Sequence, residues 1–126
     1  MAQSIRDFER SFVTGSASLA TKQYYAVKQH TDGTLIIGAA ATDKIVGILQ
    51  NKPAVGAAAL VRFLGTSKAV AGGTITVGAW VTCKSDGTVI ATTTDKDVVI
   101  GKYLGTASAA SGDIVEIQLQ MFTLSA

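Results

Sequence analysis

Charged and aromatic residues are scarce in this chain, whereas small and aliphatic residues are abundant. Of its 126 residues, 16% are charged and 6% are aromatic, against 48% that are hydrophobic. A soluble domain usually carries more charge, so alanine, glycine, threonine and serine must cover much of the surface. Such a surface suits close contact with other protein molecules and is less suited to a dilute monomer.

The residues that carry most enzyme chemistry are also nearly absent. His30 is the only histidine and Cys83 the only cysteine, so an intrachain disulfide is excluded and no paired metal-ligand spacing exists. We expect His30 to be a polar turn residue and Cys83 a small buried strand residue. Asp43 and Asp95 could be imagined as an acid–base pair, but each is followed by lysine, which favours a solvated turn with a local ion pair. The sequence therefore predicts no enzyme, no metal and no cofactor.

Little in the sequence would bind nucleic acid or a membrane. The net charge of +2 comes from scattered lysines and arginines, without a basic run. No stretch approaches the roughly 18 consecutive apolar residues of a membrane span. Charged residues at positions 6, 7, 9 and 10 interrupt the region where a secretory signal would be apolar. We therefore expect neither kind of partner, and a protein that folds and acts, or is assembled, where it is made.

A β-rich unit occurs twice, over residues 24–65 and again over residues 79–121. Three landmarks recur at a spacing of 54: a turn Asp-Gly, a mid-strand glycine and a valine in the last strand, at 32–33 and 86–87, 47 and 101, 61 and 115. The Thr-Asp-Lys triplets at 42–44 and 94–96 are the exception, with a spacing of 52. Two copies indicate a pseudo-symmetric domain rather than an open solenoid.

Strand and hairpin signals fill both copies. An Asp-Gly step supplies the positive φ that tight hairpins require, so we expect hairpins around residues 31–33 and 85–87. Residues 115–121 alternate between apolar and polar, which is typical of a strand with one buried face. We expect an all-β domain of about eight short strands. Its form would be a small barrel, or a β-clip or β-tulip-like domain, built from two similar halves.

Residues 1–21 differ from the repeat, and we expect them to form an N-terminal arm attached to a single β domain over residues 22–126. A capping-box pattern at 4–7 and the helical spacing of Ile5, Phe8 and Phe12 predict a short helical segment, followed by a flexible joint at 14–18. The phenylalanines could pack on the domain's own core or dock on a partner. In the second alternative, Ile5, Phe8, Phe12 and Val13 are the docking residues.

Several phrases of the sequence together resemble the capsid cement, or head decoration, proteins of tailed bacteriophages. They are VGILQNKP at 46–53, VAGGTITVG at 70–78 with Val81, SDG at 85–87 and ASGDIV at 110–115. The resemblance spans roughly residues 25–119, while the N-terminal arm and Trp80 depart from the family pattern. It implies a β-rich domain, often trimeric, without catalytic residues. It also implies a position on the outside of the icosahedral shell, at or near three-fold positions, where the protein locks neighbouring capsid subunits after expansion.

The expected partner is therefore the major capsid protein, bound by a homo-oligomer for which a trimer is favoured. The expected location is the exterior of the virion's capsid, after assembly in the bacterial cytoplasm. A tail-tube, connector or head-fibre protein could share this composition and is the first alternative. A small glycan- or ligand-binding β-module, with Tyr24, Tyr25 and Trp80 as its platform, is the second.

Overall fold

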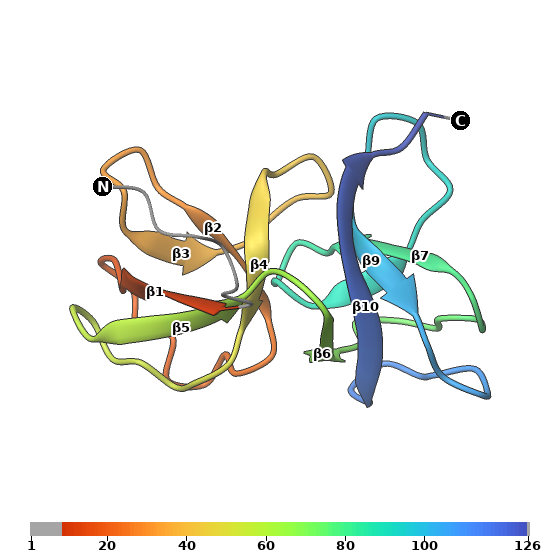
Figure 1. Ribbon diagram of the computed structural model, residues 1–126, viewed down its shortest axis with the longest axis horizontal. Helices are drawn as coiled ribbons and strands as arrows, with labels where there is room; N and C mark the ends of the chain where they lie inside the picture. Colours follow the sequence, from red (N-terminus) through yellow and green to blue (C-terminus); the bar gives the residue numbers. More distant parts are fainter. Residues whose placement is uncertain (1–8, 126) are drawn as a thin grey trace.

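The computed structural model describes residues 9–125, and within them the chain forms ten strands and no helix (Figure 1). The first sheet contains β1 (Glu9–Val13), β2 (Ala26–Gln29), β3 (Leu35–Ile37), β4 (Ile45–Leu49) and β5 (Ala58–Arg62). The second contains β6 (Thr66–Val70), β7 (Trp80–Cys83), β8 (Val89–Ala91), β9 (Val98–Tyr103) and β10 (Ile114–Thr123). All pairings between these strands are antiparallel. The all-β class is confirmed, with ten strands where about eight were expected.

The two sheets have the same strand order, which confirms the prediction of two similar halves. The order is β1-β5-β4-β2-β3 in the first sheet and β6-β10-β9-β7-β8 in the second. Val27 pairs with Ile37 and Gly47, and 54 residues later Val81 pairs with Ala91 and Gly101. Each half also has a register shift directly after that valine. The duplication therefore extends to the hydrogen-bond register.

The sequence alignment of the two copies is wrong at two places. Leu49 pairs with Val61 whereas its equivalent, Tyr103, pairs with Ile117, so β5 and β10 correspond at a spacing of 56 and not 54. The slip is even, and because strand side chains alternate between faces it keeps the same residues buried. The equivalent of Asp43 is Asp97, since their amides donate to Ala40 and Thr94 in the same turn.

The last correspondence joins β1 to β6. Val61 pairs with Arg10 in β1, and its equivalent Ile117 pairs with Ser67 in β6, which gives a spacing of 57. Residues 9–12 therefore lie in a strand of the first sheet and not in the predicted helix. The hydrogen bonds that β5 offers to an extended chain explain the difference, because a short isolated helix has little stability of its own. Ile5 and Phe8 lie outside the described residues.

Each sheet curls toward closure without becoming a closed barrel. The end of β1 reaches β3 at a single parallel bridge, Thr14 to Leu35, and the end of β6 reaches β8 at Ala71 to Val89. No other pairing joins these outer strands within residues 9–125. The observed form is thus two curled, open sheets lying side by side rather than one small barrel (Figure 1).

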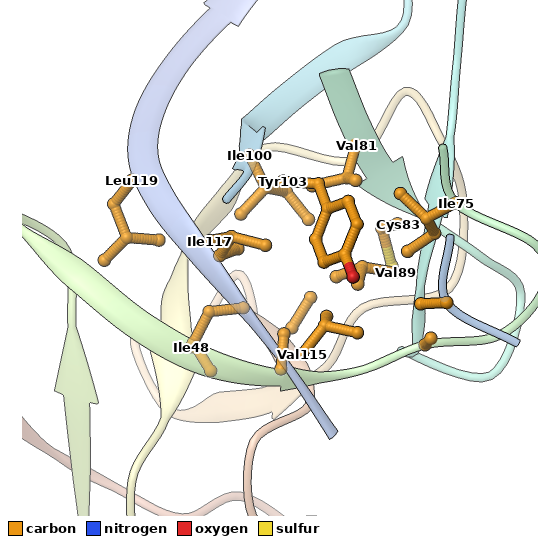
Figure 2. Close-up of a cluster of buried hydrophobic side chains, with 14 of the residues drawn as sticks. Ile48, Ile75, Val81, Cys83, Val89, Ile100, Tyr103, Val115, Ile117 and Leu119 are labelled. Carbon is orange, nitrogen blue, oxygen red and sulfur yellow. The ribbon is translucent and has the colours of Figure 1, made fainter. Parts of the chain in front are cut away.

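The buried side chains form two clusters of unequal size. The smaller belongs to the first half alone and contains Leu19, Val27, Leu35, Leu49, Ala59 and Val61. The larger fills the second half and is drawn in Figure 2. Ala26, Ile45 and Ile48 of the first half also belong to this larger cluster. The two halves therefore share a core, which makes their association part of the folding free energy.

Two glycines allow the strands to pack closely at equivalent places. A Cβ atom on Gly47 would overlap the carbonyl oxygen of Arg62, and one on Gly101 would overlap that of Gln118. The repeated mid-strand glycine of the sequence thus marks a close approach between neighbouring strands.

The hairpin turns are equivalent in detail as well. Asp32 accepts hydrogen bonds from the amide and hydroxyl of Thr34, and Asp86 accepts the same pair from Thr88. The glycines that follow the two aspartates have φ of 87° and 86°, as the Asp-Gly signal predicts.

Candidate binding surface

Of the four docking residues expected from the sequence, the structure places two, both in β1. Val13 is 57% exposed, whereas Phe12 is half-buried against the smaller core cluster. The guanidinium of Arg10 lies over the Phe12 ring, 4.9 Å from its centroid. Phe12 thus packs on its own domain and also remains partly accessible. Packing on the core and docking on a partner are therefore compatible for this side chain.

An apolar groove of about 510 Å³ begins at Phe12 and crosses from the first half to the second. It is lined by Arg10, Phe12, Val46, Phe63, Leu64, Leu119, Gln120 and Met121. These residues come from β1, β4, β10 and the connection between β5 and β6. Leu64 is 43% exposed, and Phe63 and Met121 are half-buried. We refer to this surface as the Phe12 groove.

Sequence reasoning missed most of the Phe12 groove. Phe63 and Leu64 follow β5 directly, so they look like the continuation of a buried strand. Gly65, with a φ of 82°, turns the chain immediately after them and leaves Leu64 at the surface. The one sequence feature that could have indicated an exposed apolar residue here is the adjacent apolar pair directly before a glycine.

Ion pairs join side chains within the first half. Arg62 binds Glu9 of β1 at 2.7 Å, and its other nitrogen donates to the carbonyl of Thr66 at 3.0 Å. This side chain therefore connects β1, β5 and the start of β6. Lys28 and Asp43 form a second pair at 2.8 Å. Partial burial works to raise the pKa of Asp43, but hydrogen bonds from Lys28 and the Ala39 amide outweigh it, and the pKa is lowered.

Among the residues weighed for chemistry, Cys83 and Asp43 interact electrostatically. His30 is exposed in the first hairpin, 3.4 Å from Asp32. Cys83 is buried, and burial raises the pKa of its thiol to about 11, with a smaller contribution from the charge of Asp43. Asp43 is engaged with Lys28, and Asp95 lies in the other half, where it is not the equivalent of Asp43. Among residues 9–125 no group of three or more potential ligands could hold a metal ion.

The aromatic residues proposed as a ligand platform each have a separate neighbour. Lys68 lies 5.8 Å above the Tyr24 ring and Lys22 lies 4.9 Å above Tyr25. Trp80 packs edge-on against Phe122, with 4.9 Å between ring centroids. In the described part of the chain, no helix is long and apolar enough to cross a membrane.

Comparison with known protein families identifies the family to which the chain belongs. The family model of the phage cement proteins matches residues 11–119. The chain belongs to the phage cement protein family. The match covers nearly all of both halves, and it confirms the resemblance found in the sequence.

The fold of this cement protein also occurs in a phage head fibre. The structure of the N base of the head fibre of bacteriophage phi29 superposes with a TM-score of 0.66 at 22% sequence identity, covering 94% of this chain and 99% of that one. At that identity the likeness establishes the fold. No curated protein matches the sequence. The cement protein is therefore a structural protein of a phage and a component of the virion.

Proposed function

We propose that this cement protein binds the outer surface of a phage capsid and stabilises the expanded shell by bridging neighbouring capsid subunits. The observation that carries the proposal is the family match over residues 11–119. The partner is the major capsid protein, and the role is structural rather than enzymatic. The protein is assembled in the bacterial cytoplasm, and neither nucleic acid nor a membrane takes part.

The Phe12 groove is the proposed capsid-binding surface. It is an apolar depression that spans both halves, and Phe12 and Leu64 offer accessible apolar area within it. Burial of apolar surface stabilises an interface by about 25 cal/mol per Å², so a few such side chains give a modest affinity. Ile5 and Phe8, which precede β1, and Val13, which follows Phe12 but lines a neighbouring groove, remain capsid-docking residues in our proposal.

A modest affinity is sufficient when several copies bind together. We propose that the cement protein acts as a homo-oligomer, with a trimer favoured. Once one copy is bound, the binding of the next is effectively intramolecular, and the total strength rises by orders of magnitude. The low surface charge of the chain is consistent with such packing between proteins.

The test uses two matched leucine variants and expanded empty heads. Leu64 is 43% exposed in the groove, and Leu104 is 41% exposed in the second half. Leu64→Glu should reduce co-sedimentation with heads at least ten-fold, because a carboxylate would be buried at the interface. Leu104→Glu should change it by less than two-fold.

Heat release of the packaged contents, measured on filled expanded heads, provides the second readout. Heads with the wild-type protein should resist higher temperatures than heads without it, and heads with Leu64→Glu should behave as if undecorated. If the wild-type protein does not sediment with expanded heads, capsid binding is refuted. If both leucine variants bind normally, the binding surface lies elsewhere and the groove is refuted.

A role at the base of a head fibre is the second candidate. It is favoured by the shared fold with the phi29 head fibre base. Electron microscopy of decorated heads would separate the two roles, since a fibre base carries a projecting density above it whereas a cement protein lies flat between capsid subunits.

A further inference from the structure

The two halves of the molecule contact each other through surfaces that are not equivalent. The first half contributes Tyr24-Tyr25-Ala26, which we call the first-half turn. The amide of Ala26 donates to the carbonyl of Gly87 at 2.8 Å, and the carbonyl of Tyr24 accepts from the amide of Val70 at 3.1 Å. Lys68 lies above the Tyr24 ring. We call Lys68, Val70 and Gly87 the second-half socket.

The first half contains an equivalent of this socket, and it faces outward. At the spacings of 57 and 54 established above, the equivalents of Lys68, Val70 and Gly87 are Ser11, Val13 and Gly33. We call these three residues the first-half socket. All three line one groove of about 310 Å³. The duplicated fold therefore provides a second binding site of the same design.

Exposure distinguishes the two sockets. A Cβ atom on Gly87 would meet the Ile37 side chain at 2.5 Å, whereas one on Gly33 would have no neighbour within 4 Å. Val13 is 57% exposed, and Val70 is half-buried. The second-half socket is thus covered by the other half, and the first-half socket is not covered by residues 9–125.

The amide of Val13, in β1, is oriented so that it can donate a hydrogen bond to a chain bound in this socket. Thr14 donates its amide to Ala57, next to β5, and Gly15 donates in the opposite direction to Leu35. Because successive amides of a strand point to opposite sides, the amide of Val13 also points away from β5. The equivalent amide, that of Val70, is the one that bonds to Tyr24.

The second half, in turn, contains an equivalent of the first-half turn. Gly78-Ala79-Trp80, the second-half turn, follows Tyr24-Tyr25-Ala26 by 54 residues. Tyr24 and Gly78 share a positive φ, of 70° and 80°. The amide of Ala79 donates to Thr76 as that of Tyr25 donates to Lys22. Gly78 is exposed, the preceding Val77 is 57% exposed, and Ala79 and Trp80 are half-buried, so the start of this turn is accessible.

We propose that the second-half turn of one molecule binds the first-half socket of a second molecule, so that copies of the chain assemble head to tail. The occupant is a second copy because the chain already contains this pairing once, between its own halves. If the halves were related by a two-fold axis, the second-half turn would also bind the first-half socket of the same molecule. Among the described residues that reciprocal contact is missing. Repetition of a head-to-tail contact produces a ring when the rotation closes.

Side chains at the new contact are suited to each other. Trp80 stands where the first-half turn has the small Ala26, and it would bring an aromatic ring to a groove that Arg10 and Phe12 also line. Arginine binds the face of an indole ring favourably, most strongly when water is excluded. The proposal concerns contacts between copies. Although Arg10, Phe12 and Val13 also border the proposed capsid-binding surface, the proposal is tested without a capsid.

Disulfide trapping with the isolated full-length chain tests the direction of assembly. Val13→Cys and Ala79→Cys are made in separate chains, because the amide of Val70, the equivalent of Val13, bonds to the carbonyl of Tyr24, directly before Tyr25, which is the equivalent of Ala79. Cys83 can stay because its thiol is buried. Under mild oxidation, a 1:1 mixture should give at least ten-fold more crosslinked dimer than either variant alone. Val55→Cys, at an equally exposed valine, should not crosslink to Ala79→Cys.

Two outcomes would overturn the proposal. Efficient dimers of Val13→Cys alone would show a symmetric contact between two β1 strands. Absence of crosslinks from the mixture, at concentrations where light scattering detects oligomers, would place the contact elsewhere. As a second measurement, Val77→Arg should reduce the mass in solution toward the 12.9 kDa of one chain, and Val55→Arg should not. Circular dichroism spectra of both arginine variants that match the wild-type spectrum would establish that folding is intact.

Discussion

Replacement of Ile48 by alanine tests whether the two halves unfold together. Ile48 is fully buried and belongs to the first half by sequence, but its side chain lies in the cluster of the second half (Figure 2). The substitution removes three carbons, which is about 2.4 kcal/mol at about 0.8 kcal/mol per buried CH₂. The cavity left behind raises the total to about 2–5 kcal/mol. With a urea slope of about 2 kcal/mol/M, the midpoint should fall by roughly 1 to 2.5 M.

Fluorescence of Trp80 is the assay, because this only tryptophan lies in β7 of the second half. A loss of stability caused in the first half should appear in full at this probe if the halves share one transition. Ile114→Ala, at a position 55% exposed, is the control and should change stability by less than about 0.5 kcal/mol. An unchanged Trp80 transition in Ile48→Ala, with a shifted circular dichroism transition, would refute the shared core.

Three further predictions concern close packing, acid stability and thiol reactivity. Gly101→Ala should lower the unfolding free energy by about 1–3 kcal/mol in urea titrations, because the added Cβ would overlap the Gln118 carbonyl. Gly73→Ala should be close to neutral, because a Cβ atom there would lie 3.6 Å from its nearest neighbour. Hydrogen bonds from Thr88 lower the pKa of Asp86, so the Asp86 carboxylate stabilises the fold above its unfolded pKa, and this stability is lost as the pH falls through the lowered value. Asp86→Asn should therefore flatten the fall in thermal midpoint below about pH 4. An unchanged slope would contradict the assignment. Burial and a pKa near 11 should keep Cys83 unreactive toward iodoacetamide at pH 8 until urea unfolds the chain, and rapid labelling of the native protein by mass spectrometry would be inconsistent with the buried site.

The parts of the fold that local sequence determines were predictable. Asp-Gly pairs specify their turns through a positive φ and a side-chain hydrogen bond to the next threonine, so both hairpins were found. The repeat of Gly47 as Gly101 reflects one close contact between strands, made twice. Such features depend on neighbours in sequence or on one residue type, and they remain visible without a structure.

Features that depend on distant partners were not predictable in the same way. Residues 9–13 form a strand because β5, about fifty residues later, supplies their hydrogen bonds. The Phe12 groove joins β1, β4 and β10 with the β5–β6 connection, so no local pattern marks it. The spacing predicted between β5 and β10 was wrong by two residues, because the β4–β5 and β9–β10 loops differ in length. The sequence pattern did not reveal this error, since an even shift leaves the alternation of buried and exposed side chains unchanged.

The separation of the two sheets along the chain affects how the protein emerges from the ribosome. Every strand of the first sheet finds its partners before residue 63, and the second sheet begins at Thr66. At about 5–20 residues per second, synthesis of the last sixty residues takes roughly 3 to 12 s. Throughout that interval the nascent first sheet exposes Ala26, Ile45 and Ile48, whose cover has not yet been made. The nascent chain of this protein therefore leaves that apolar face uncovered until the second half is available to pack on it.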